Sequence, residues 1–325
     1  MANPTLSVVI PYYRGEHVIC EAVESVLAQT LQPREIVICD DGSSDDLRAA
    51  LGSLCQQVKI VRKDNGGIAS AMNALTDAAG GDYLVQLDQD DAFMPRRLEA
   101  IAATLAARPE VDVVATDAIV EHDGETVTIL DPASHFPEDE QRTAILHECT
   151  FLWPAIRRSL LVEVGGYDES FAVMQDWECF VRLVLSGALI AFVHEPLYRW
   201  RLTPGSRSSS DRLANIEAQI RMTSKILSGS QLSAEERKAA QALLASRRRW
   251  LLREQARHAV QTHAADARRR SLQLVLGSGF DRASRVKAAV AVLSPGIAAR
   301  FLEGRRERTD PAIEALAQRG FHVPR

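Results

Sequence analysis

Three carboxylates follow an apolar run in the segment YLVQLDQDDAFMP: Asp88, Asp90 and Asp91. Like charges this close raise one another's pKa unless a cation or hydrogen-bond donors offset them. Two kinds of structure would do so. The carboxylates can cap the next helix in a turn, or they can bind a divalent cation, which prefers oxygen ligands and often combines one or two carboxylates with phosphate oxygens.

The elements that position these acids alternate between strand and helix. The predicted strands are too continuously apolar for a sheet with one solvated face, which is typical of strands covered on both sides. They span residues 6–11, 35–40, 58–62, 83–88 and 111–116. Helical spacing fills the segments between them. This alternation predicts an α/β fold with a Rossmann-like, mostly parallel sheet flanked by helices.

Polar residues stand at the carboxyl ends of four of these strands, where open α/β sheets bind their ligands. Aromatic rings follow the first strand, carboxylates the second and fourth, and a lysine with glycines the third. The residues are Pro11, Tyr12, Tyr13, Asp40, Asp41, Lys63, Gly67, Asp88, Gln89 and Asp90. Because the carboxyl ends of parallel strands meet at one edge, we expect a single acidic crevice there.

Charge divides the chain of 325 residues into two parts. Residues 206–325 carry 23 Lys and Arg against 11 Asp and Glu, a net charge of about +12, whereas residues 1–205 carry about −17. We therefore predict an α/β domain over 1–205 and a basic helical C-terminal region over 206–325. Within that region, Ser233 and Glu236 have the spacing of a capping box at the start of a helix.

Composition excludes several classes of protein. The chain is 46% apolar and 25% charged, which is typical of a globular domain. No apolar stretch approaches the roughly 20 residues that span a bilayer, and the first residues lack the pattern of a secretory signal. Neither the five cysteines nor the eight histidines show metal-ligand spacing. We expect a cytoplasmic protein, with peripheral contact to the inner face of the membrane as an option.

In their order and spacing, five segments resemble glycosyltransferase family 2, the inverting nucleotide-sugar enzymes with a GT-A fold. They are SVVIPYYRGEHVICEAVESVLAQT, EIVICDDGSSDD, NGGIASAMNALTDAAGGDYLVQLDQDD, GGYDES and QDWECFVRL. The resemblance implies a metal-dependent transferase that moves a sugar from a nucleotide-diphosphate donor, expected to be a UDP-sugar, to a hydroxyl acceptor. The acceptor would be a saccharide or a lipid-linked saccharide, in cell-surface polysaccharide or glycolipid synthesis.

The family pattern implies a nucleotide pocket at the ends of the first two strands. Four residues match its start, where an aromatic ring can lie against a flat base: Pro11, Tyr12, Tyr13 and Glu16. Packing at the strand end is the alternative for the two tyrosines. Asp41 matches the carboxylate that accepts a hydrogen bond from uracil N3–H, with Asp40 as its support. The alternative for these carboxylates is an Asx turn.

Two further strand ends match donor-binding elements of the family. Lys63 and Gly67 precede a helix, where free backbone N–H groups favour anions, so they either contact the donor or form a glycine turn. The Asp-x-Asp element falls on residues 88–90, with Gln89 at its centre. There Asp90 would ligate Mn²⁺ or Mg²⁺, and Asp88 would hold the ribose or a metal-bound water. We expect Asp91 to cap the following helix.

The resemblance assigns the catalytic base to Asp176 in the segment QDWECF. Inversion needs one carboxylate near the acceptor hydroxyl, opposite the leaving group. The alternative is that Asp176 caps a helix. Trp177 forms either an acceptor-binding platform or part of the core.

The sequence is compatible with more than one binding partner for the basic C-terminal region, residues 206–325. The acidic body argues against nucleic acid, and contact with anionic lipid head groups at the inner membrane surface fits the charge. Packing of the tail against its own catalytic domain, or against a partner subunit, fits equally. A non-catalytic nucleotide-sugar-binding or scaffold protein that retained the pocket is the alternative to an enzyme.

Overall fold

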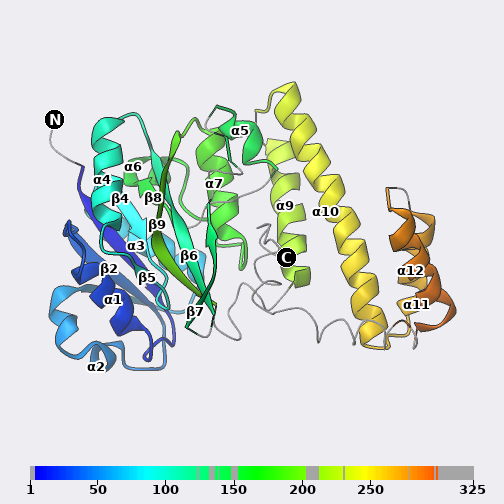
Figure 1. Cartoon of the computed structure of the whole chain (residues 1–325), viewed down its shortest axis with the longest axis horizontal. Helices are drawn as coiled ribbons and strands as arrows, with labels where there is room; N and C mark the ends of the chain where they lie inside the picture. The colour runs from blue at the N-terminus through cyan, green and yellow to red at the C-terminus, as the bar shows by residue number, and fades with distance from the viewer. Residues whose placement is uncertain are drawn as a thin grey trace. The chain divides into compact units, whose positions relative to one another are not determined.

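The computed structural model describes residues 4–122, 124–131, 136–137, 139–147, 153–202, 212–229, 231–277, 279–295 and 298. The chain divides into two compact units, Met1–Pro204 and Gly205–Arg325. The first contains the strands and seven of the described α-helices, and the second is helical throughout its described part (Figure 1).

One sheet of nine described strands forms the centre of the first unit (Figure 1). Their order is β3-β2-β1-β4-β8-β6-β9-β5, with β7 paired to β6. The bounds are β1 Leu6–Tyr12, β2 Glu35–Asp41, β3 Lys59–Lys63, β4 Tyr83–Gln86, β5 Ala92–Phe93, β6 Val113–His122, β7 Glu125–Leu130, β8 Ala155–Arg157 and β9 Ile190–Leu202.

The predicted α/β fold is confirmed, and its sheet also contains antiparallel strands. Strands β3, β2, β1 and β4 run parallel, and so do β6 and β9. Between β4 and β6 lies β8, antiparallel to both. The sequence did not reveal β8 because its three residues are too few to show a period.

Helices cover the central strands, so that every residue of β1 is buried. In α1, buried Ile19, Ala22, Val23 and Val26 recur at the spacing of one helical face. The helices of this unit are α1 Ile19–Leu27, α2 Leu47–Leu51, α3 Ile68–Ala78, α4 Arg97–Ala107, α5 Gln141–Ala144, α6 Arg158–Glu163 and α7 Gln175–Leu185.

The second unit contains α9 Arg212–Gly229, α10 Ala234–Gln261, α11 Ala267–Leu276 and α12 Arg282–Leu293. The predicted capping box is confirmed at the start of α10. The Ser233 amide donates to Glu236 Oε2 at 2.8 Å, and the Glu236 amide donates to Ser233 Oγ at 3.1 Å. None of the described helices combines the length and apolarity that crossing a membrane requires.

Ser233→Ala is expected to lower the free energy of unfolding of the second unit by about 1 kcal/mol, because an N-terminal amide of α10 loses its acceptor. Urea denaturation followed by circular dichroism measures this. Ser246→Ala, at an exposed position inside the same helix, is the matched control and is expected to be neutral or slightly stabilising. Equal effects of the two substitutions would contradict a role for the cap.

Candidate functional site

The carboxyl ends of β1, β2 and β3 meet at one edge of the sheet, as the sequence predicts. In the parallel register, Tyr12 pairs with Asp40, and Asp41 pairs with Lys63. Asp41 accepts three hydrogen bonds at this edge. Its Oδ1 accepts from Lys63 Nζ at 2.8 Å and from the Gly66 amide at 3.0 Å, and its Oδ2 accepts from the Gly67 amide at 2.8 Å.

The Asp41 carboxylate therefore shapes the loop that leads into α3. Its side chain is only 5% exposed, and the chain's own donors use three of its roughly four acceptor positions. Gly67, with φ +84°, is the residue before the first turn of α3. Its left-handed conformation turns its amide toward Asp41 at a backbone geometry that suits glycine.

Asp40 supports the same edge from the other side. Its Oδ2 lies 3.0 Å from Arg62 Nη1, and its Oδ1 accepts from the Ser43 amide at 2.8 Å. The Asp40 side chain is 3% exposed, whereas Arg62 is 63% exposed. Asp40 thus fixes the turn after β2 and holds an arginine at the rim of the crevice.

The two tyrosines after β1 have different environments. Tyr12 is 1% exposed, and its hydroxyl donates to Asp45 Oδ2 at 2.6 Å. Burial raises the pKa of Tyr12 above its ordinary value, and the Asp45 contact adds to the shift. Tyr13 is half-buried, and the Arg14 guanidinium lies 5.0 Å from its ring centroid. Of the two rings, only Tyr13 is open to a ligand.

Asp45, which sequence reasoning missed, ties the first two strand ends together. Besides the Tyr12 hydroxyl, it accepts from the Glu16 amide at 3.3 Å and from the Ser43 hydroxyl. Glu16 itself is exposed and Pro11 is buried. A polar residue inside the segment DDGSSDD gives no signal that would single it out.

Gln89, at the centre of the Asp-x-Asp element, joins that element to the end of β1. Its Oε1 accepts from the Tyr13 amide at 2.8 Å, and its Nε2 donates to the Tyr13 carbonyl at 3.1 Å. The side-chain amide thereby imitates a β-bridge. This pair of bonds holds Asp88 and Asp90 beside the carboxyl end of β1.

The carboxylates of the Asp-x-Asp element are half-buried. Asp88 Oδ2 accepts from Trp153 Nε1 at 2.8 Å, and its Oδ1 accepts from Gln86 Nε2 at 3.0 Å. Both donors are neutral, so these bonds orient Asp88 without cancelling its charge. Carboxylate oxygens are the hard donors that a divalent cation prefers, so Asp88 and Asp90 fit such a metal.

The expectation that Asp91 caps the next helix is wrong. Asp91 is 1% exposed, and it accepts from the Tyr198 hydroxyl and from the Arg201 amide, each at 2.8 Å. Burial raises the pKa of Asp91 well above its ordinary value, and the charges of Asp88 and Asp90 raise it further. Strand β5 separates it from α4, which begins at Arg97, so its carboxylate binds β9 instead.

An aromatic cluster that the sequence did not reveal packs beside the Asp-x-Asp element and binds Asp88. Trp153 stacks on Tyr198 with ring centroids 4.2 Å apart, and the Tyr198 hydroxyl accepts from the Asp88 amide at 3.2 Å. Arg97, fully buried, lies 4.9 Å from the Tyr198 ring and donates to the Trp153 carbonyl at 2.6 Å. Burial lowers the pKa of Arg97 to about 10.

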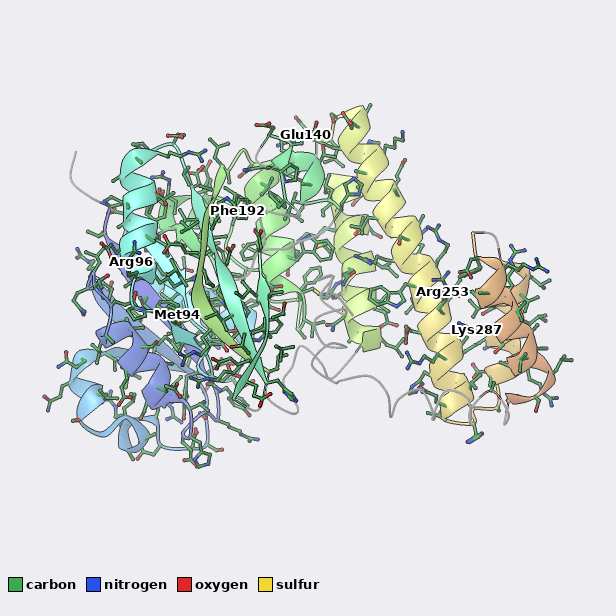
Figure 2. All side chains as sticks on the ribbon, viewed as in Figure 1. Met94, Arg96, Glu140, Phe192, Arg253 and Lys287 are labelled. Atoms are coloured by element: carbon green, nitrogen blue, oxygen red, sulfur yellow. The ribbon has the colours of Figure 1, made fainter. Side chains whose placement is uncertain are left out.

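Arg97→Ala is expected to destabilise the first unit by about 3 kcal/mol, because it empties a buried volume and leaves the Trp153 carbonyl without this donor. Urea unfolding monitored by tryptophan fluorescence measures the change. The neighbouring Arg96 (Figure 2) is 59% exposed, and Arg96→Ala is expected to change stability by less than about 0.5 kcal/mol. A similar loss in both variants would contradict the structural role of Arg97.

Asp176 lies in the first turn of α7 and is half-buried. Its Oδ1 accepts from the Trp177 amide at 2.8 Å. The residue before the helix is Met174, which makes no side-chain cap bond, so Asp176 stands inside the helix and not at its cap. Trp177 is 5% exposed and donates to the Ile145 carbonyl at 3.0 Å, which favours the packing role over an acceptor platform.

Tyr167 is a buried residue whose pKa responds to both Asp176 and Asp88. Burial raises the pKa of Tyr167 well above its ordinary value, and the charges of Cys179, Asp176 and Asp88 add to that shift. Both carboxylates therefore lie within electrostatic reach of one buried hydroxyl. Asn73 fixes this segment, since its Oδ1 accepts from the Tyr167 amide at 2.8 Å and its Nδ2 donates to the Tyr167 carbonyl at 2.9 Å.

Comparison with known proteins finds similarity to glycosyltransferases over about half of the chain. The family model described as glycosyl transferase family 2 matches residues 7–165. An uncharacterized glycosyltransferase of Rickettsia prowazekii is 27% identical over 209 residues, which are 62% of this chain and 64% of that protein. The match thus spans slightly less than two thirds of this relative.

Two solved structures share the fold. The crystal structure of S. aureus TarS 1-349 in complex with UDP-GlcNAc superposes with a TM-score of 0.58 at 18% identity, over 98% of this chain and 93% of that one. The mannosyltransferase PcManGT from Pyrobaculum calidifontis, in complex with GDP-Man and Mn²⁺, superposes with a TM-score of 0.59 at 18% identity, over 99% of this chain and 88% of that one. These similarities confirm the predicted GT-A fold.

Proposed function

We propose that the chain, whose residues 7–165 match the family model of glycosyl transferase family 2, moves a sugar from a nucleotide-diphosphate donor to a hydroxyl acceptor with inversion. The observation that supports this most is the meeting of strand ends: Gln89 binds Asp88 and Asp90 to the end of β1, next to the Asp41 edge. That arrangement supports a nucleotide pocket beside a metal pair.

We propose that the nucleotide is UDP. The half-buried ring of Tyr13 would lie against the base, and the remaining acceptor position of Asp41 would receive the uracil N3–H. Lys63 and the amides of Gly66 and Gly67 are held by Asp41, so they would shape the pocket and contact the donor only at its edge. The TarS structure contains UDP-GlcNAc and the PcManGT structure contains GDP-Man, so the fold accommodates either base.

Asp90, with Asp88, would hold the divalent cation, Mn²⁺ or Mg²⁺. When bound, such an ion supplies positive charge to the diphosphate as the sugar departs. The chain's own contribution is orientation: Trp153 and Gln86 fix the Asp88 carboxylate, and Gln89 fixes the backbone between the two acids.

Asp176 would act as the general base that receives the proton of the acceptor hydroxyl. Its bond to the Trp177 amide sets the direction of one oxygen and leaves the other available. Because an ordinary carboxylate is a weak base, proton transfer would accompany formation of the glycosidic bond. Attack from the side opposite the diphosphate inverts the anomeric centre.

We propose that the acceptor is a saccharide or a lipid-linked saccharide of the cell surface.

We also propose that the second unit docks on anionic lipid. An apolar cavity of about 430 Å³ in the second unit is lined by three basic residues of α10 and α12, Arg253, Arg257 and Lys287, and by one acid, Glu254. Figure 2 labels Arg253 and Lys287 on these two helices. A positively charged rim around apolar lining suits a phosphate head with a hydrocarbon chain. Sedimentation with vesicles containing phosphatidylglycerol, but not with purely phosphatidylcholine vesicles, would support this docking.

A thermal-shift screen of UDP-, GDP- and dTDP-sugars, each with and without Mn²⁺, tests the function. Stabilisation by a UDP-sugar that requires Mn²⁺ would support the donor and the metal together. Stabilisation without transfer to any saccharide acceptor would favour the alternative, a non-catalytic nucleotide-sugar-binding or scaffold protein. Absence of stabilisation by every donor would contradict the nucleotide pocket.

A further inference from the structure

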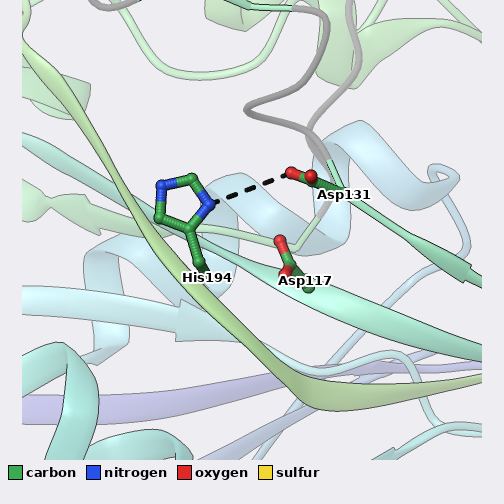
Figure 3. Close-up of side chains that lie close together, drawn as sticks. All are labelled: Asp117, Asp131 and His194. Atoms are coloured by element: carbon green, nitrogen blue, oxygen red, sulfur yellow. Dashed lines mark ion pairs between the residues drawn. The ribbon is translucent and has the colours of Figure 1, made fainter.

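Three side chains from neighbouring strands converge at a second place in the first unit. Asp117 belongs to β6, His194 to β9, and Asp131 directly follows β7 (Figure 3). One ligand atom of each lies within 4.8 Å of one ligand atom of both others. The His194 Nδ1 to Asp131 Oδ1 distance is 4.0 Å.

An irregularity in strand pairing builds this cluster. Thr116 pairs with Val193, but the next residue of β6, Asp117, pairs with Pro196. Strand β9 therefore carries two extra residues, His194 and Glu195, opposite a single step of β6. Such bulges redirect side chains and are common beside functional sites. Here the bulge brings an imidazole next to two carboxylates.

Among the three residues of the cluster, Asp117 gives the strongest indication of a missing ligand. It is 8% exposed, and its Oδ1 has no hydrogen-bond partner among the described residues. A buried carboxylate oxygen without a donor is costly. Burial raises the pKa of Asp117 to about 6, and the charge of Asp131 also raises it, whereas His194 lowers it. A cation between the three side chains would satisfy that oxygen.

We propose that Asp117, Asp131 and His194 form a binding site for a divalent transition-metal ion of the Zn²⁺ type, separate from the Asp88–Asp90 pair. Imidazole together with carboxylates favours such an ion, whereas Mg²⁺ and Ca²⁺ prefer oxygen ligands alone. Three protein ligands leave a fourth position open to water. The site braces the bulge four residues before Tyr198, the residue that binds Asp91.

The geometry needs only a small adjustment to bind the ion. Metal–ligand bonds of roughly 2.0–2.2 Å place the ligand atoms of a tetrahedral ion about 3.4 Å apart. The Asp131 and His194 side chains are 47% and 65% exposed, so they can rotate inward by that amount. Asp117 is fixed in the sheet and provides the anchor.

Isothermal titration of the EDTA-treated full chain with ZnCl₂ tests the proposal. At least one saturable equivalent is expected in the wild type, and one should persist in Asp90→Ala. His194→Ala and Asp131→Asn, both at exposed positions, are expected to weaken Zn²⁺ binding at least about tenfold. His147→Ala, an exposed histidine outside the cluster, is the matched control and should bind as the wild type does. MgCl₂ should not displace the bound Zn²⁺.

Retention of full Zn²⁺ affinity in both His194→Ala and Asp131→Asn would overturn the site, as would its loss in Asp90→Ala. Absence of saturable binding in the wild type would also overturn it. Circular dichroism of each variant excludes unfolding as the cause of a loss. The readout is binding and not activity, so this test can fail while the proposed transferase function stands, and the reverse.

Discussion

Asp176→Asn is expected to lower kcat by about 10²–10⁴-fold, the usual contribution of a general base, while donor affinity stays unchanged. The amide cannot receive the acceptor proton. It keeps the size of the carboxylate, and its oxygen can still accept from the Trp177 amide, so α7 should begin as before. Steady-state transfer rates and calorimetric binding of the UDP-sugar, measured on the same preparation, give the two quantities.

Asp77→Asn is the matched control for this substitution. Asp77 is an exposed carboxylate on α3, and its removal is expected to leave kcat unchanged. If Asp176→Asn transferred sugar at the wild-type rate, Asp176 would not be the base. If it lost donor binding together with activity, Asp176 would belong to the donor pocket and the base would lie elsewhere.

The features that were predicted correctly depend on residues close together in the sequence. Apolar runs predicted β1, β2, β3, β4 and the start of β6, and the Ser233–Glu236 spacing predicted the start of α10, because both depend on residues close in sequence. The convergence of Asp41 and Lys63 at one edge also followed, since parallel strands align their carboxyl ends. These are the features in which the sequence and the structure agree.

Long-range contacts decided the features that the sequence did not reveal. Asp91 looked like a helix cap, but its partners are on β9, more than 100 residues away in the chain. Trp153 orients Asp88 across a separation of 65 residues. The Asp117, Asp131 and His194 cluster depends on a register shift between β6 and β9, which no spacing rule can detect. Each of these contacts requires knowing which strands are neighbours.

Asp90→Ala is expected to lower the transfer rate by about 10³-fold, because it removes the main protein ligand of the metal ion. The positive charge of that ion balances the negative charge of the departing diphosphate. EDTA should have the same effect on the wild type, and Mn²⁺ or Mg²⁺ in excess should restore it. Neither ion should restore Asp90→Ala. Initial rates with the UDP-sugar across a metal titration measure both effects.

Stability separates this metal role from the capping role that a cluster of acids can also have. Helix α4 begins at Arg97 and has no side-chain cap bond, so Asp90→Ala should not destabilise α4 by removing a cap. A variant that was unstable but fully active would reverse the assignment. Full activity of the wild type in EDTA would do so too. His194→Ala completes the test: if its metal titration of activity matches that of the wild type, the ion that supports transfer is the one at Asp90.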